Sequence, residues 1–499
     1  MYLINGDAIQ SQDFLSVIEE GKVGIHPEAR ERMQASRNVV DQIVAKNEVV
    51  YGITTGFGKL SDVRIPLEKL NQLQLNLVRS HACGVGDPLL EDEVRGLMLL
   101  RANVLAVGCS GARPIIAETL AKMLNAGVTP FIPEQGSVGA SGDLAPLAHL
   151  ACVLIGEGEA FFKGERLSGA QAMARAGIEP VVLEAKEGLA ILNGTQALTS
   201  VGTIALMRAE RVSRAADVAA MLTLDALRDT PAAYDPRIQQ IRPHKGQIEV
   251  AENLRRLMEG SEIRESHRYS DTRVQDAYSL RCIPQVHGAV RDVLRHVRGV
   301  LEIESGSGTD NPLVFVDTGE VISGGNFHGA PVAMALDYAA IGVTDLMGII
   351  ERRIERLVNP DLSEGLPAFL TSEAGMGSGY MIPQVVAVAL TNEAKVLAHP
   401  ASVDNMPTSA GKEDHVSMGM VAATKLRRIV ANAERALAIE FLAACDGLEY
   451  RKPLTTSPQL QKAFEIVRSY AEKLTEDRSL TNEIEAVAGA IRRGEFDTI

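Results

Sequence analysis

The chain has 499 residues, of which 46% are hydrophobic and 23% are charged, proportions typical of a folded protein with a large core. A formal net charge of -14 argues against nucleic acid or an anionic membrane as the main partner. The 5 cysteines are scattered and form no C-x-x-C pair, so neither a disulfide framework nor a zinc site is predicted, and a reducing cytoplasm fits.

No targeting or membrane-spanning segment is expected. Residues 1–7 lack the basic and apolar regions of a signal peptide, which favours a cytoplasmic location. Residues 188–207 and 374–392 carry no charge over a membrane-like length. Amide, hydroxyl and glycine residues interrupt both stretches, so we predict that they are buried inside protein.

Helical periodicity dominates the chain, because apolar residues recur at three- and four-residue spacing in long segments. This pattern predicts helices over residues 27–46, 67–80, 91–107, 144–155, 188–228, 273–303, 327–358, 383–399 and 414–448. Short strands are predicted at residues 49–51 and 131–132, and a hairpin at residues 313–316 and 320–323 around the turn 317–319.

A boundary between two regions is predicted near residue 195. Residues 1–195 contain short helices and glycine-rich loops, which we expect to carry the chemistry. Residues 196–499 contain helices of about 30 residues, roughly 45 Å each, which predict an elongated bundle. Long helices with apolar faces usually pack against partners, so a homo-oligomer is expected. The fold class is therefore mainly α, a long-helix bundle preceded by a loop-rich N-terminal region.

The triplet Ala140-Ser141-Gly142 is the candidate for unusual chemistry. Gly142 has no side chain, so its amide nitrogen can approach the Ala140 carbonyl and close a five-membered ring across Ser141. Loss of the Ser141 hydroxyl then leaves an electrophilic methylene group on the ring. The same residues also suit an ordinary turn before a helix, with Asp143 as the N-cap and Pro146 in the first turn. The triplet alone leaves both interpretations open, since short motifs often match by chance.

Other catalytic signatures are absent from the sequence. It contains no G-x-G-x-x-G, Walker A, H-E-x-x-H or G-x-S-x-G motif, and its 10 histidines lack metal-ligand spacing. Distant polar blocks stand out instead: Tyr51-Gly-Ile-Thr-Thr-Gly-Phe-Gly58, Ser80-His81-Ala-Cys-Gly-Val-Gly86, Leu192-Asn193-Gly-Thr-Gln196, Val274-Gln275-Asp-Ala-Tyr278-Ser-Leu-Arg281-Cys-Ile-Pro-Gln285, Gly324-Gly-Asn-Phe327-His-Gly329 and Glu413-Asp-His-Val-Ser-Met418.

Together with Gly136-Ser-Val-Gly-Ala-Ser-Gly-Asp-Leu-Ala-Pro-Leu-Ala-His149, these blocks resemble the aromatic amino acid ammonia-lyase family over essentially the whole chain. The resemblance implies a fold of the ammonia-lyase and fumarase–aspartase type. It also implies the prosthetic group 4-methylidene-imidazole-5-one (MIO), formed autocatalytically from Ala140, Ser141 and Gly142, with no metal and no pyridoxal phosphate (PLP). Homotetramers whose active sites are shared between subunits are implied as well.

Two residue roles at the reacting centre follow from the resemblance. Tyr51 matches the tyrosine that removes the β-proton of the amino-acid substrate. A free phenol has a pKa near 10. To serve as a base at neutral pH, the phenol of this tyrosine must therefore have a lower pKa or be deprotonated in the complex. Asn193 matches the residue that orients the cofactor carbonyl and the substrate. Taken alone, Tyr51 would be a half-buried packing residue and Asn193 a turn residue before glycine.

Four further residues match positions around the substrate and the cofactor. Arg281 matches the residue that binds the substrate carboxylate, for which a guanidinium fork is suited. Tyr278, with a catalytic role, and Gln275 match residues near the amino-acid end of the substrate and the cofactor. Phe327 matches an aromatic neighbour of the cofactor. Without the resemblance, Arg281 would form a structural ion pair and Phe327 would pack in the core.

The Ser80-His81 pair and Glu413 determine the expected substrate ring. Ser-His is similar to the histidine-specific members, whereas tyrosine- and phenylalanine-specific members tend to have His-Leu or Phe-Leu. We expect Glu413 to pair with a ring N–H or an imidazolium and His81 to hydrogen-bond the same ring, whereas a phenyl ring would leave a buried Glu413 unpaired. The resemblance thus implies elimination of ammonia from L-histidine to give trans-urocanate. Helix-end positions favoured by the helix dipole would equally explain both side chains.

The chain departs from the histidine-specific pattern at two positions beside these residues. Lys412 stands where glutamine is usual, and Thr54 stands where many members have asparagine and tyrosine-specific relatives have threonine. Two alternatives to histidine elimination are a tyrosine or phenylalanine ammonia-lyase or an aminomutase with the same chemistry, and a helical scaffold without catalysis.

Overall fold

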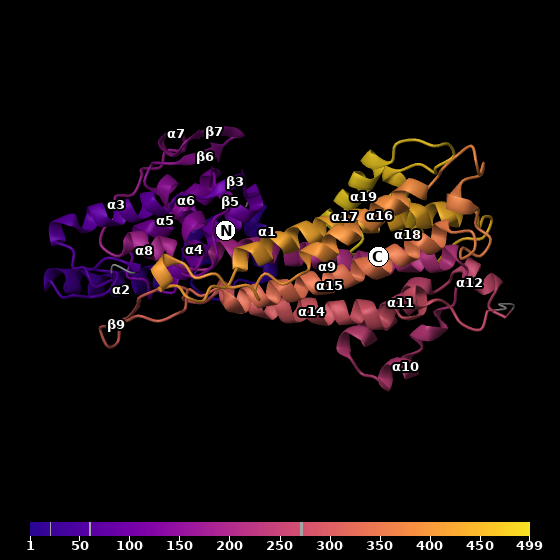
Figure 1. Ribbon diagram of the computed structural model, residues 1–499, viewed down its shortest axis with the longest axis horizontal. Coiled ribbons are helices and arrows are strands. Elements are labelled where there is room, and N and C mark those ends of the chain that lie inside the picture. Colours follow the sequence, from indigo (N-terminus) through magenta and orange to yellow (C-terminus); the bar gives the residue numbers. More distant parts are fainter. Residues whose placement is uncertain (20, 59–60, 270–272) are drawn as a thin grey trace. The chain divides into compact units, whose positions relative to one another are not determined.

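The computed structural model describes residues 1–19, 21–58, 61–269 and 273–499. The described chain is mainly α-helical, which confirms the predicted fold class (Figure 1). It divides into two compact units. Unit 1 comprises Met1–Ile204, Arg298–Asp337 and Pro400–Thr424, and unit 2 comprises Ala205–Val297, Tyr338–His399 and Lys425–Ile499. The division predicted at residue 195 stays a prediction about functional regions.

Unit 1 combines short helices with small sheets. Its helices are α1 (Ser11–Ile18), α2 (Pro27–Ala45), α3 (Leu70–His81), α4 (Glu91–Ala106), α5 (Pro114–Ala126), α6 (Leu144–Leu154), α7 (Gly169–Arg175) and α8 (Glu187–Leu192), with 3-10 turns η2 (Leu67–Lys69) and η5 (Ser409–Gly411). Its strands are β1 (Tyr2–Ile4), β2 (Val23–Ile25), β3 (Val85–Pro88), β4 (Val128–Pro130), β5 (Pro133–Gln135), β6 (Glu159–Phe162), β7 (Glu165–Ser168), β8 (Leu313–Phe315) and β9 (Glu320–Ile322).

The strands of unit 1 pair as β1–β2 in parallel and as β3–β5, β4–β6–β7 and β8–β9 in antiparallel order. The predicted hairpin is confirmed, with Leu313 opposite Ile322 and a left-handed Gly319 in the turn. The strand predicted at residues 131–132 is wrong in position, because the strands β4 and β5 lie directly before and after these residues. Their backbone still bonds to neighbouring segments, from the Phe131 N–H to the Glu159 carbonyl and from the Leu89 N–H to the Ile132 carbonyl, both at 2.8 Å. The strand at residues 49–51 is also wrong, because the Val50 carbonyl accepts hydrogen bonds from Ile53 and Thr54 and closes a turn there.

Helix α4 forms the centre of unit 1. It packs against α1, α2 and α5, and its residues from Glu93 to Ala106 are buried. The buried Arg95 donates to the carbonyls of Val17 and Ile18 at the end of α1 and of Leu124 near the end of α5. One guanidinium therefore binds carbonyls near the ends of two helices, where a positive charge is also favoured.

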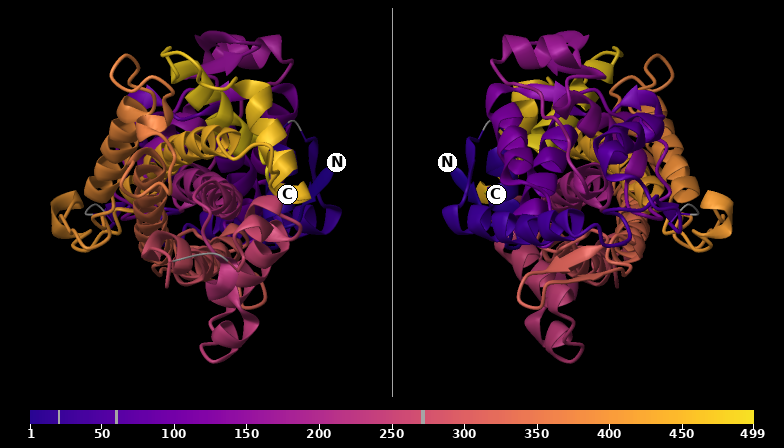
Figure 2. Two further views of the ribbon diagram at one scale, coloured as in Figure 1. Left: turned by 90° about the vertical axis from the view of Figure 1, so that its right-hand side faces the viewer. Right: turned by 90° about the vertical axis from the view of Figure 1, so that its left-hand side faces the viewer.

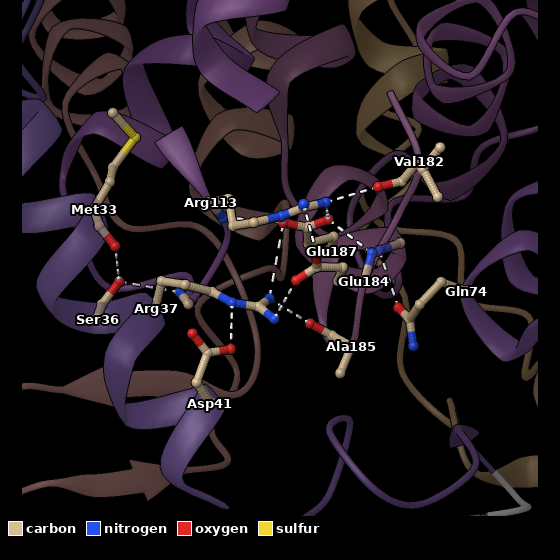
Figure 3. Close-up of polar contacts among 12 residues, drawn as sticks. Met33, Ser36, Arg37, Asp41, Gln74, Arg113, Val182, Glu184, Ala185 and Glu187 are labelled. Carbon is tan, nitrogen blue, oxygen red and sulfur yellow. Dashed lines mark hydrogen bonds and ion pairs between the residues drawn. The ribbon is translucent and has the colours of Figure 1, made fainter. Parts of the chain in front are cut away.

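An ion-pair network fixes the start of α8 (Figure 3). The fully buried Glu187 receives two hydrogen bonds of 2.7 Å from Arg113. Arg37 of α2 donates to Glu184 at 2.9 Å, and Gln74 of α3 accepts from the Gly188 N–H at 2.9 Å. Because charged groups from α2 and from the loop before α5 meet here, the short helix α8 is held in one orientation.

Long helices pass from unit 1 into unit 2 or back: α9 (Gln196–Ala226), α14 (Ile283–Ser305), α15 (Ala330–Val358) and α17 (Gly419–Glu449). Unit 2 further contains α10 (Pro236–Gln240), α11 (Lys245–Met258), α12 (Glu262–Ser266), α13 (Tyr278–Arg281), α16 (Met381–Leu397), α18 (Pro458–Tyr470), α19 (Thr481–Arg493) and the 3-10 turns η3 (Pro231–Tyr234) and η4 (Ala368–Leu370). In unit 2 the α9 residues 215–226 are all buried, as expected of a helix inside a bundle (Figure 2).

Two long predicted helices are interrupted. Residues 188–228 form α8 and α9 with a break at residues 193–195, where Gly194 has φ +139°. Residues 273–303 do not start as a helix, since α13 begins at Tyr278 and α14 at Ile283. Among the described residues, α15 is the one helix long and apolar enough to cross a membrane by composition, and 67% of its apolar window is buried.

A network of buried charged side chains links the helices inside unit 2. His287 Nδ1 lies 2.7 Å from Asp217 Oδ1, and Arg353 Nη1 lies 3.2 Å from His287 Nε2. Arg353 also binds Glu440 through two hydrogen bonds of 2.6 and 3.0 Å. Since the guanidinium only donates, His287 Nε2 accepts and the ring is neutral. Burial, reinforced by Arg353, lowers the pKa of His287 to about 4 despite the opposing effect of Asp217.

This lowered pKa predicts an acid-sensitive fold. His287 titrates near 6.5 when unfolded and near 4 when folded, so its contribution to stability is present above pH 6.5 and is lost as the pH falls toward 4. The loss amounts to at most about 3 kcal/mol. We expect the thermal midpoint to fall less between pH 7 and pH 4.5 in His287→Gln than in the wild type. The control His296→Gln, at an exposed histidine, should keep the wild-type slope, and equal slopes in all three proteins would contradict the assignment.

Candidate active site

The loop that carries the triplet is held by the segment before α17. The Met418 N–H donates to the Val138 carbonyl at 2.8 Å, and Ser417 Oγ donates to the Gly139 carbonyl at 3.0 Å. Ser137 Oγ accepts from the Gly139 N–H at 3.2 Å. The contacts of Val138 and Gly139 join this loop to a part of the chain that lies 278 to 280 positions later in sequence, and they anchor the loop that carries the triplet.

The triplet ends in a close contact between two glycines. Gly142, at φ +75°, pairs with Gly194 in an isolated β-bridge, and the Asp143 N–H donates to the Gly194 carbonyl at 2.7 Å. A Cβ added to Gly142 would lie 2.1 Å from the Gly194 oxygen. A Cβ on Gly194 would lie 2.5 Å from the carbonyl oxygen of Thr309. Both positions therefore require glycine, and their approach explains the break between α8 and α9.

Asp143 does not cap α6 with its side chain, in contrast to the sequence-based expectation. Its carboxylate instead accepts 2.8 Å hydrogen bonds from Ser137 Oγ and from the Leu198 N–H in the first turn of α9. Burial raises the pKa of Asp143 to about 6, and these hydrogen bonds oppose the rise. Asp143 thus caps the helix that follows Gly194, which ties the triplet to the start of α9.

A cavity of about 610 Å³ lies in unit 1 beside the triplet. Its wall includes all six of the sequence-predicted residues that belong to unit 1 and have side chains able to contact a substrate: Tyr51, His81, Ser141, Asn193, Phe327 and Glu413. Leucine, isoleucine and valine side chains from α3, α6, α8 and the loop after residue 62 complete much of the wall. Such a mainly apolar cavity with a few convergent polar groups is typical of a small-molecule site.

Glu413 is the acidic group of this wall. Its Oε1 accepts from Ser141 Oγ at 2.8 Å, and its Oε2 accepts from Thr408 Oγ1 at 2.5 Å and Ser409 Oγ at 2.8 Å. Burial acts to raise the pKa of Glu413, but these hydrogen bonds and the nearby His81 outweigh it and hold the pKa below its ordinary value. Glu413 is therefore a carboxylate at neutral pH.

The orientation of His81 follows from its neighbours at the end of α3. His81 Nδ1 lies 2.8 Å from the Leu77 carbonyl and 3.0 Å from Ser80 Oγ. Because a carbonyl oxygen only accepts, Nδ1 carries a proton, and in the Nδ1–H tautomer Nε2 is an acceptor. In this tautomer His81 adds a second hydrogen-bond acceptor to the residues that line the cavity.

Asn193 is held in place by groups that the sequence did not identify. Its Nδ2 donates to the Asn311 carbonyl at 2.8 Å, and its own carbonyl accepts from Arg101. Arg101 is completely buried in α4 and also donates to Gln196 Oε1 at 2.9 Å. Burial lowers the pKa of Arg101 to about 10. The sequence feature that could have identified Arg101 is a charged residue among mainly apolar neighbours, in the run from Leu97 to Ala106.

The remaining predicted residues lie in unit 2. Gln275 and Tyr278 are exposed, the latter to 71%, and the Arg281 guanidinium lies 4.5 Å from the centre of the Tyr278 ring. Asp276 anchors this segment by accepting from the Thr230 N–H at 2.8 Å. The grouping of Gln275, Tyr278 and Arg281 with the residues of the cavity stays a prediction.

The two departures from the family pattern differ in their surroundings. Thr54 is buried, and its Oγ1 donates to the Glu48 carbonyl at 2.7 Å and accepts from the Val50 N–H at 3.0 Å. It therefore stabilises the turn before the glycine-rich loop. Lys412 is exposed beside Glu413, and nothing in the structure explains its presence.

The glycine contact predicts a steric effect that a matched variant can isolate. Gly127, at the end of α5, has φ +74°, nearly the same as Gly142, but no atom would approach its Cβ within 4 Å. Gly127→Ala should cost about 1 kcal/mol from backbone strain alone. Gly142→Ala should cost at least about 3 kcal/mol, because the added Cβ displaces the Gly194 carbonyl. Equal unfolding midpoints of the two variants would contradict the required approach.

Proteins similar to this chain in sequence and fold include ammonia-lyases and aminomutases. A sequence model described as aromatic amino acid lyase matches residues 9–469. A histidine ammonia-lyase from Koribacter versatilis (strain Ellin345) is 56% identical over 492 residues, covering 96% of this chain and 95% of that protein. The crystal structure of histidine ammonia-lyase from Trypanosoma cruzi is similar with a TM-score of 0.92 and 44% identity, covering 100% of this chain and 94% of that one. A tyrosine aminomutase from Streptomyces globisporus has a TM-score of 0.94 and 39% identity, covering 100% and 98%. The predicted resemblance is confirmed, and the chain belongs to the aromatic amino acid lyase family.

Proposed function

We propose that the protein eliminates ammonia from L-histidine to give trans-urocanate. The observation that carries the choice of substrate is the carboxylate of Glu413, with His81 nearby, in the wall of a mainly apolar cavity. Glu413 is half-buried, and among the described residues its Oε1 is held only by the Ser141 hydroxyl. An imidazole ring supplies N–H donors to such a carboxylate, and a phenyl ring lacks them. The high identity to a protein named histidine ammonia-lyase over nearly the whole chain supports the same substrate.

We propose MIO as the prosthetic group, formed from Ala140, Ser141 and Gly142. The residues present fit this group, because Gly142 has no Cβ and lies in a left-handed conformation that brings its backbone against Gly194. Ser141 lines the cavity, and Ala140 is buried behind it. Once formed, MIO supplies the electrophile that activates the amino group of the substrate for departure.

The chain's own residues supply proton transfer and positioning. Tyr51 lines the cavity with Ser141 and takes the β-proton in the bound complex. Asn193, fixed by the Asn311 carbonyl, orients the reacting groups through its amide. Phe327 shapes the cavity wall beside the triplet. Glu413 and His81 bind the ring.

We propose that Arg281 binds the substrate carboxylate, with Gln275 and Tyr278 beside it, and that a neighbouring subunit contributes this segment. The 71% exposure of Tyr278 supports this, because a catalytic tyrosine needs a partner surface to enclose it. The apolar face of α16 also supports a homotetramer, since it exposes Ile382, Val385 and Val396 to 58%, 52% and 70%. In this proposal residues 1–195 carry the MIO loop and residues 196–499 provide most of the oligomer contacts.

A cytoplasmic location completes the proposal. Cysteines 83, 109, 152, 282 and 445 are all free thiols in the structure, which suits a reducing compartment. An amino-acid substrate and a prosthetic group made from the chain itself require neither nucleic acid nor a membrane as a partner.

Product analysis and intact mass test the proposed function together. The purified protein should convert L-histidine to trans-urocanate, which the rise in ultraviolet absorbance of the conjugated product measures. Its mass should be lower than that of the translated chain by two water molecules, lost from residues 140–142. Formation of coumarate or a β-amino acid instead of urocanate would indicate the tyrosine-specific or aminomutase alternative. An unchanged mass without activity would indicate a scaffold.

Mixing two inactive variants tests the roles of Tyr51 and Tyr278 and the sharing of sites. Tyr51→Phe and Tyr278→Phe should each lower kcat by at least about 10²-fold, since each loses a phenol at the reacting centre. If the two tyrosines of one site come from different subunits, random co-assembly of equal amounts should restore about a quarter of the sites. Urocanate formation by the co-expressed variants measures this recovery. No recovery would contradict shared sites, and full activity of Tyr51→Phe would remove Tyr51 as the base.

A further inference from the structure

Two carboxyl groups lie close to the triplet, and they are directed differently. Asp143 directs its oxygens to Ser137 Oγ and to the Leu198 N–H. Glu413 directs its Oε1 to Ser141 Oγ at 2.8 Å, the hydroxyl that must leave if the triplet forms MIO. Glu413 is thus the carboxylate in contact with the leaving group of the maturation reaction.

We propose that Glu413 has a second task that precedes catalysis: it carries the proton that allows the Ser141 hydroxyl to leave. This inference rests on the proposed function, because it concerns the formation of the same MIO group. It assigns one side chain to both the making of the site and the binding of the substrate ring.

The atoms balance with a single carboxylate. In ring closure Gly142 N bonds to the Ala140 carbonyl carbon, and a first water leaves with that carbonyl oxygen and the protons of Gly142 N and Ser141 N. In the second step the Cα–H and Cβ–Oγ bonds of Ser141 break and a Cα–Cβ double bond forms. Glu413 takes the Cα proton and delivers it to Oγ, so the hydroxyl departs as water and the carboxylate is regenerated. No electrons are gained or lost.

The surroundings of Glu413 suit a proton carrier. Its second oxygen is fixed by Thr408 and Ser409, and the Thr408 N–H donates to the Glu413 backbone carbonyl at 2.9 Å. The first oxygen is thereby aimed at Ser141 without freedom to turn away. The lowered pKa of Glu413 keeps it ionised and ready to accept a proton at neutral pH.

Loss of the Ser141 hydroxyl also changes what Glu413 can bind. Oε1 accepts from Ser141 before the reaction and loses that donor afterwards. A carboxylate oxygen that faces a mainly apolar cavity without a donor costs free energy, which a ring N–H of the substrate restores. Maturation therefore opens the ring-binding position at the same atom that assisted it.

Time-resolved intact mass of newly made protein tests this role. The full chain is synthesised in a cell-free system and sampled at intervals, and peptide mapping locates any missing mass at residues 140–142. Wild-type protein should reach a mass two waters below the translated chain. Glu413→Gln keeps the size of the side chain and an oxygen that accepts from Ser141, but it carries no proton at neutral pH. We expect its two-water form to accumulate about 10²-fold more slowly.

A matched control tests whether any change beside Glu413 slows maturation. Lys412→Gln removes an exposed charge next to Glu413 but leaves the Glu413 carboxylate and its hydrogen bonds in place, so it should mature at the wild-type rate. Equal slowing in both variants would overturn the assignment to Glu413. So would a two-water loss in Glu413→Gln at the wild-type rate, and in that case the proposed function would stand. Absence of the two-water loss in the wild type would instead remove the proposed function itself.

Circular dichroism establishes whether each variant is folded. If Glu413→Gln does not fold, Glu413→Asp decides, because it retains a carboxylate on a side chain that is one carbon shorter. Slower maturation of folded Glu413→Asp than of the wild type supports the proton carrier, since the carboxylate no longer reaches Ser141 Oγ at hydrogen-bond distance. An equal rate overturns it.

Discussion

The site in unit 1 depends on the contact between the backbones of Gly142 and Gly194. Any side chain at either position would overlap the facing backbone segment or its neighbours. The shortest distance, 2.1 Å, joins a Cβ added to Gly142 and the carbonyl oxygen of Gly194. The contact therefore brings the loop of the triplet directly against the break between α8 and α9. Ser141 and Asn193, which are adjacent to these glycines, consequently line the same cavity. A backbone contact, rather than a side-chain interaction, sets the position of the reactive groups.

Buried charged side chains hold this contact from both sides. Asp143 caps the start of α9, and Arg101 binds the carbonyl of Asn193 just before the break. Burial raises the pKa of Asp143 to about 6 and lowers the pKa of Arg101 to about 10. Both shifts favour the neutral form of the side chain and reflect the cost of taking a charge out of water. An apolar pair would avoid this cost but would leave the N–H and carbonyl groups at the helix ends without partners. The charges are therefore retained where irregular backbone has to be buried.

Periodicity in the sequence predicted the helices well where each helix is limited by its own sequence. Helix α4 and helix α6 end within one residue of their predicted ends. The break at residues 193–195 was missed, because it arises from contact with Gly142 some fifty residues earlier and an uncharged run conceals it. Arg101 was missed for a related reason: its partners are carbonyl and amide groups exposed only by that break. Local patterns do not encode such distant requirements.

The candidate residues were predicted because distant motifs of the chain resemble those of one family. The structure places these residues in two different units. The cavity collects those of unit 1, including Tyr51, His81 and Glu413, from segments up to 362 positions apart in the printed chain. Gln275, Tyr278 and Arg281 are in the other unit, and in the proposed function they complete the cavity of a neighbouring subunit. A site assembled by oligomerisation is encoded in surfaces that remain exposed until partners bind, so neither periodicity nor one folded chain identifies its full set of residues.

The polar groups that face the proposed ring position still restrict the choice of substrate. Glu413 is a carboxylate and offers acceptor oxygens, and in the Nδ1–H tautomer of His81 the Nε2 atom also accepts. A phenyl ring brings no donor to these acceptors and a phenol brings one. A protonated imidazole brings two, and its ordinary pKa near 6.5 lies close enough to neutrality for a neighbouring carboxylate to favour the charged form. The number of acceptors in the wall, rather than its shape, is therefore what favours histidine over the other aromatic amino acids.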